Sequence, residues 1–68
     1  MWAIKNKHTN EWVYGTCFGY PKNTQRTSNE KAMLFEDERE VLTEFERRDC
    51  GGDFEICEVK LVVTAIMT

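Results

Sequence analysis

The chain has 68 residues, of which 41% are hydrophobic and 31% are charged, and its formal net charge is −3 at pH 7. This composition is too apolar for a disordered tail and too polar for a membrane protein, and the length leaves room for one domain only, residues 1–68. We therefore expect a single small cytoplasmic domain without a secretory signal or a membrane span.

Two strands are predicted at the start of the chain. Residues 2–5 alternate large apolar side chains with small or polar ones, and residues 11–18 repeat this period of two. The polar segment 6–10 contains asparagines, which tolerate a left-handed backbone, so it is typical of a short hairpin connection. We expect the register to follow from the aromatic side of the second strand, which consists of Trp12, Tyr14 and Phe18.

A long loop is predicted for residues 19–29, because this segment has no apolar periodicity and contains glycine, proline and several hydrogen-bonding residues. The apolar run Ala32–Phe35 suits a short strand as well as a helix. We favour a brief third strand at this run.

The acidic segment 36–40 predicts the start of a helix, with Asp37 as the N-cap and Glu40 completing a capping box. The helix is expected over residues 38–49, and the glycine pair 51–52 after it supplies a left-handed stop. Its apolar stripe is narrow and consists of Val41, Leu42 and Phe45.

The segment 54–63 is rich in β-branched residues and predicts the best-formed strand. Phe54 and Ile56 fall on the face opposite to the apolar series Cys57, Val59, Leu61 and Val63. This conflict implies either a bulge or partial cover on both faces. Together the elements predict an α+β fold, a small antiparallel sheet of three or four strands with one helix packed on one face, in the order β-β-(β)-α-β.

The chain offers little material for catalysis or metal binding. Its one histidine, His8, falls in a predicted turn, and its cysteines have none of the paired spacings of zinc sites: Cys17, Cys50 and Cys57. We expect free thiols, no metal, no cofactor, no catalytic residue and no enzymatic activity.

Two contact surfaces are candidates. The first is acidic and would dock on a basic partner, although such a pattern is also typical of a solvated helix face: Glu36, Glu38, Glu40 and Glu44. The second is the predicted loop, with Tyr20, Lys22 and Arg26. Because the helical stripe is narrow, the aromatic sheet face or the terminal strand should also stay exposed, for partner binding or homodimerisation.

The charge is divided unevenly along the chain. Residues 1–27 hold four basic residues against one acidic residue, which gives +3, so the remainder carries −6. A nucleic-acid-associated protein would use the basic residues Lys5, Lys7, Lys22 and Arg26. The net charge of −3 opposes non-specific binding of this kind, so nucleic acid is the alternative partner.

Three segments resemble small uncharacterised accessory proteins of bacteriophages, especially those of Gram-positive hosts. They are the opening Trp2–Asn6, the run Lys31–Phe35 before the acidic helix, and the strand Phe54–Val59. The resemblance implies an early or accessory protein of host takeover, with a host or phage protein as partner, and carries over no site residue. We accordingly expect a small non-enzymatic protein-binding module, an inhibitor or modulator of a host protein.

Overall fold

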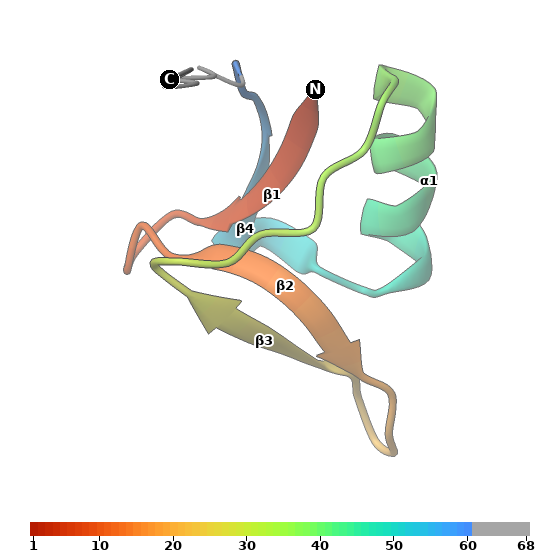
Figure 1. Ribbon diagram of the computed structural model, residues 1–68. Helices are drawn as coiled ribbons and strands as arrows, with labels where there is room; N and C mark the ends of the chain where they lie inside the picture. Colours follow the sequence, from red (N-terminus) through yellow and green to blue (C-terminus); the bar gives the residue numbers. More distant parts are fainter. Residues whose placement is uncertain (61–68) are drawn as a thin grey trace.

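A four-stranded antiparallel sheet with one helix packed against it makes up the fold, and the computed structural model describes residues 1–60 (Figure 1). The strand order is β3-β2-β1-β4, so the first hairpin occupies the middle of the sheet. The elements are β1 (Trp2–Asn6), β2 (Trp12–Cys17), β3 (Thr24–Ser28), α1 (Glu38–Arg47), a 3-10 turn (Gly51–Asp53) and β4 (Phe54–Glu58). The predicted α+β fold is confirmed.

The first hairpin forms where the alternating pattern predicts it, but its buried contact is aliphatic. Ile4 in β1 and Val13 in β2 are fully buried. Trp12 lies opposite Lys5 in the register, on the face away from Val13, because neighbouring strand residues point to opposite faces. Because Val13 points into the core, Trp12 and Tyr14 on either side of it point to the other face, so the aromatic side of β2 does not form the core. A register shift lies between Val13 and Gly15.

The third strand lies in the segment predicted to be a loop. β3 pairs with β2 from Thr24 to Ser28, within residues 19–29. Its five residues, Thr-Gln-Arg-Thr-Ser, are polar on both faces, as an edge strand that packs few apolar neighbours can be. The strand therefore leaves no apolar periodicity in the sequence, and the prediction of a loop through Asn29 is wrong.

The apolar run Ala32–Phe35 is not a strand of its own, contrary to the prediction. Phe35 exchanges two backbone hydrogen bonds of 2.8 Å with Trp2, and Met33 N donates to the Val13 carbonyl at 3.0 Å. Figure 1 shows β1 and β2 diverging from their hairpin, and this run crosses between them. Because β1 and β2 diverge, their backbone groups at Trp2 and Val13 are free to bond with residues 33–35.

Helix α1 begins as predicted, with the Asp37 carboxylate accepting a hydrogen bond of 2.7 Å from the Glu40 amide. It ends at Arg47, two residues earlier than predicted, because Asp49 already adopts a left-handed backbone with φ 53°. Of the predicted stripe, Val41 is fully buried, Phe45 packs at the edge of the core, and Leu42 is 50% exposed. Val41 is therefore the principal core residue of the helix.

Strand β4 ends at Glu58, and its pairing with β1 is continuous, without a bulge. Phe54 and Ile56 pack against the core, while Cys57 lies opposite Ala3 on the other face of the sheet. Every residue from Phe54 to Cys57 is partly buried, so both faces are partly covered. The predicted continuation through Leu61 and Val63, and any use of it in homodimerisation, lies outside the described residues.

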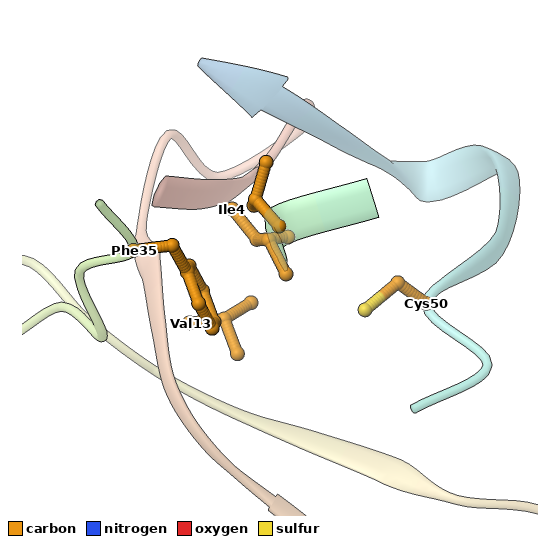
Figure 2. Packing of buried hydrophobic residues seen from close by; sticks show 5 residues of the cluster. Ile4, Val13, Phe35 and Cys50 are labelled. Carbon is orange, nitrogen blue, oxygen red and sulfur yellow. The ribbon is translucent and has the colours of Figure 1, made fainter. Parts of the chain in front are cut away.

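The core is small and draws on every layer of the fold. Figure 2 shows Ile4, Val13 and Phe35 packed together, with the Cys50 sulfur pointing toward them from the turn after α1. Val41 adds the helix to this cluster. Within residues 1–60 no helix has the length and apolarity needed to cross a membrane.

Candidate functional site

The hairpin between β2 and β3 carries the most exposed aromatic residue of the described chain. We define the hairpin tip as residues 18–23, which connect the two strands. The Tyr20 side chain is 99% exposed, and Phe18 is 52% exposed. In Figure 1 the connection between β2 and β3 extends beyond the ends of the two strands, away from β1 and β4.

Local bonds hold the tip at its base. Gly19 N donates to the Asn23 side-chain oxygen at 3.2 Å, which closes the turn around Tyr20. The Phe18 ring lies beside two guanidinium groups, with Cζ of Arg47 at 5.2 Å and Cζ of Arg48 at 5.9 Å from its centroid. Such cation–π contacts are favourable at these distances, so Phe18 is held on the C-terminal end of the helix.

A network of side chains, which we call the polar latch, joins the hairpin to the end of α1. Arg48 Nη1 donates to Thr16 Oγ1 at 2.9 Å, and Thr16 Oγ1 donates to Gln25 Oε1 at 2.6 Å. Gln25 Nε2 donates to the Arg48 carbonyl at 2.6 Å, and Asn23 Nδ2 donates to Asp49 Oδ2 at 3.1 Å. The latch satisfies the Arg48 carbonyl beyond the helix end and ties both hairpin strands to it.

The two arginines at the end of α1 both pair with one carboxylate, that of Glu44. Glu44 accepts hydrogen bonds of 2.8 Å from both Arg47 Nη2 and Arg48 Nε. The bonds from Arg47 lower the pKa of the Glu44 carboxyl, partial burial opposes them, and the bond from Arg48 lowers the pKa further. The carboxylate therefore stays ionised and orients both guanidiniums toward the hairpin.

The structure separates the predicted acidic surface. Glu36, Glu38 and Glu40 are exposed, whereas Glu44 is partly buried and bonded to the arginines. Glu38 and Glu40 are two residues apart on a helix, which places them roughly 200° apart around its axis. These acids consequently do not form one continuous ridge.

The predicted loop residues divide between the tip and a strand. Tyr20 and Lys22 lie at the tip, and Arg26 lies on β3 opposite Gly15. Because Gln25 faces α1, the neighbouring Arg26 points to the other face of the sheet. The sequence analysis placed Phe18 on the aromatic side of the second strand and did not predict the latch.

The alternative basic set is also divided. Lys5 Nζ lies 3.6 Å from the Glu55 carboxylate and 5.7 Å from the Trp12 ring centroid, so a neighbour already balances its charge. Lys7 lies in the turn between β1 and β2, away from the tip that carries Lys22. Lys7 and Lys22 thus lie at opposite ends of β2, while Lys5 and Arg26 share the sheet face away from the core, so the four basic residues do not form a single cluster.

Within residues 1–60, His8 and Cys50 lie in different surroundings. His8 Nε2 lies 3.1 Å from Asp53 Oδ1, with both side chains mostly exposed. Burial raises the pKa of the Cys50 thiol, which opposes formation of the thiolate. In the described part of the chain, no group of three or more His, Cys, Asp or Glu side chains is placed to hold a metal ion.

A shallow groove of about 320 Å³ runs between the hairpin and the turn after α1. Gln25 and Asn23 line it from the hairpin, and Asp49, Asp53 and Phe54 line it from the other side. The latch bonds of Gln25, Asn23 and Asp49 cross this boundary. The groove therefore marks the contact between the hairpin and the segment that follows α1.

Comparisons with protein families, with curated proteins and with solved structures found no match to this chain. The resemblance to bacteriophage accessory proteins consequently stays a prediction.

Proposed function

We propose that this protein is a small non-enzymatic protein-binding module whose contact element is the hairpin tip. The observation that supports this proposal is the 99% exposed Tyr20 side chain at the end of a hairpin that the latch ties to α1. Following the resemblance to phage proteins, the partner is a host protein that the module inhibits or modulates.

An exposed tyrosine on a held turn suits recognition of a protein surface. Tyrosine has two side-chain torsions, so it loses little conformational entropy when it binds, and it combines an apolar ring with a hydroxyl. Tyrosine and arginine are enriched among the residues that contribute most binding energy at interfaces. Here Tyr20 is followed by Lys22 in the tip, and Arg47 stands beside Phe18.

The tip is a better candidate than the acidic helix. Glu44 is already bonded to Arg47 and Arg48, so a partner would have to displace these bonds to reach it. Glu38 and Glu40 point to different sides of α1. The tip instead offers an exposed aromatic ring and a basic side chain at one place.

Site-specific photocrosslinking in the natural host tests this proposal. A benzophenone side chain replaces Tyr20 in one variant and Leu42 in a matched control, since Leu42 is also exposed but lies on the helix. We expect the Tyr20 probe to form a discrete adduct with one protein and the Leu42 probe to form none with it. Unlabelled parent protein should suppress the adduct, whereas the Tyr20→Ser variant should not.

The opposite pattern contradicts the proposal. Equal adducts from both probes, or an adduct that Tyr20→Ser suppresses as well as the parent does, would show that the tip is not the contact element. Circular dichroism of the variants confirms that both remain folded before the comparison is made.

A further inference from the structure

We infer that the partner surface for the hairpin tip is an apolar pocket rimmed by carboxylates on an acidic protein. This inference rests on the proposed function and specifies the chemistry of the partner. It comes from the charge of the hairpin compared with that of the remaining chain.

The hairpin is a basic and aromatic element on an acidic protein. From Trp12 to Ser28 it contains Lys22 and Arg26 and no acidic residue, so it carries +2. The whole chain carries −3, which leaves −5 for the other residues. Such a separation of charge favours approach of an acidic partner to the hairpin and disfavours its approach to the rest of the molecule.

The basic side chains of the β2–β3 hairpin, Lys22 at the tip and Arg26 on β3, are exposed. Within residues 1–60 neither Lys22 nor Arg26 has a carboxylate within 4.0 Å. Beside the tip, Glu44 is bonded to both Arg47 and Arg48, and the Asp49 carboxylate accepts from Asn23. The Arg47 side chain is 53% exposed and retains donor capacity for a further carboxylate.

The apolar part of the contact comes from the same place. Tyr20 projects fully into solvent, and the exposed half of Phe18 lies beside the arginines. A large aromatic side chain buries about 150–250 Å² when it is enclosed, so a pocket for one ring supplies most of the apolar contact. Carboxylates around that pocket would meet Lys22 and Arg47.

A nucleic acid fits these observations less well than an acidic protein. Two cations on the hairpin would neutralise about two phosphates, for which the salt dependence and the gain from released counterions are small. The −5 on the rest of the chain would repel a long phosphate backbone. A protein pocket with a few carboxylates at its rim can be matched by Lys22 and Arg47 alone.

Selection from a displayed library of random disulfide-closed peptides tests the inference and does not require the natural partner. Peptides are selected on the full-length protein after depletion on Tyr20→Ser, so that the survivors require the tip. We expect the survivors to be enriched in Asp and Glu over the starting library. Lys22→Glu should weaken their binding about tenfold or more, since like charges at an interface are strongly unfavourable.

The matched control is Lys7→Glu, which makes the same change of charge in the exposed turn between β1 and β2. We expect it to leave the peptide affinities nearly unchanged. Tyr20-dependent peptides without acidic enrichment, or equal losses from Lys22→Glu and Lys7→Glu, would overturn the inference and leave the proposed function standing.

Two further outcomes are distinct. If no selected peptide depends on Tyr20, both the inference and the proposed function fail. If a single-stranded oligonucleotide binds in a Tyr20-dependent manner more tightly than the selected peptides, the partner is a nucleic acid and the inference is overturned. Fluorescence anisotropy with labelled peptides and oligonucleotides measures all of these affinities on the same protein.

Discussion

Replacing Arg48 with methionine should weaken the attachment of the hairpin to the helix at a measurable cost in stability. The Arg48 side chain is only 15% exposed and donates to Glu44 at 2.8 Å and to Thr16 at 2.9 Å. Arg48→Met keeps an unbranched stem against Phe18 but removes both donors. Hydrogen bonds to charged groups contribute about 1.5–3 kcal/mol, and because Glu44 keeps Arg47 as a partner we expect a loss of about 2 kcal/mol.

Arg47→Met is the matched control, because Arg47 donates to the same carboxylate but its side chain is 53% exposed. Exposed ion pairs contribute little to stability. Thermal unfolding followed by circular dichroism measures both variants. In a domain of this size 2 kcal/mol corresponds to a fall of roughly 8–16 °C in Tm for Arg48→Met, and we expect no comparable change for Arg47→Met.

The same variant should loosen the tip. Backbone order parameters from ¹⁵N relaxation are expected to fall for residues 19–23 in Arg48→Met and to stay near the parent values in Arg47→Met. A Tm for Arg48→Met within about two degrees of the parent, or equal effects of the two substitutions, would refute the idea that Arg48 holds the hairpin.

Three other predictions concern the core, the acid limit and the thiols. Val41→Ala should lower the free energy of unfolding by about 2 kcal/mol because the side chain is fully buried. Leu42→Ala, at a half-exposed site, should change it by less than about 0.5 kcal/mol. Urea titration measures both variants. The pKa of Glu44 is lowered from 4.5 in the folded protein, so its stabilising contribution is present above 4.5 and is lost as the pH falls through the folded value. The difference in urea midpoint between parent and Glu44→Gln should accordingly shrink below pH 4.5, and a constant difference would contradict the shift. Iodoacetamide at neutral pH should modify exposed Cys17 well before buried Cys50, as peptide mass spectrometry will show; equal rates would mean that Cys50 is not in the core.

The sequence identifies part of the tip but does not predict the latch. Tyr20 and Lys22 are conspicuous as an aromatic and a basic residue in a polar segment, so the sequence identifies them as candidates. The bond from Arg48 to Thr16 joins residues 32 positions apart, and Gln25 meets the Arg48 carbonyl across 23 positions. No spacing rule connects such residues, since their proximity depends on where the helix ends over the sheet.

Local patterns in the sequence determine the elements whose physical causes are local. Strand alternation places the first hairpin, and the Asp37 carboxylate sets the start of the helix, because it bonds an amide that would otherwise have no partner. Tertiary structure alone decides β3, whose polar residues become a strand through backbone bonds to β2. It also decides which face of β4 is buried, since the pairing of Ile56 with Ile4 turns Phe54 and Ile56 toward the helix. A strand formed by backbone pairing alone leaves no apolar pattern in its own residues, so the pairing becomes visible only when the chain is folded.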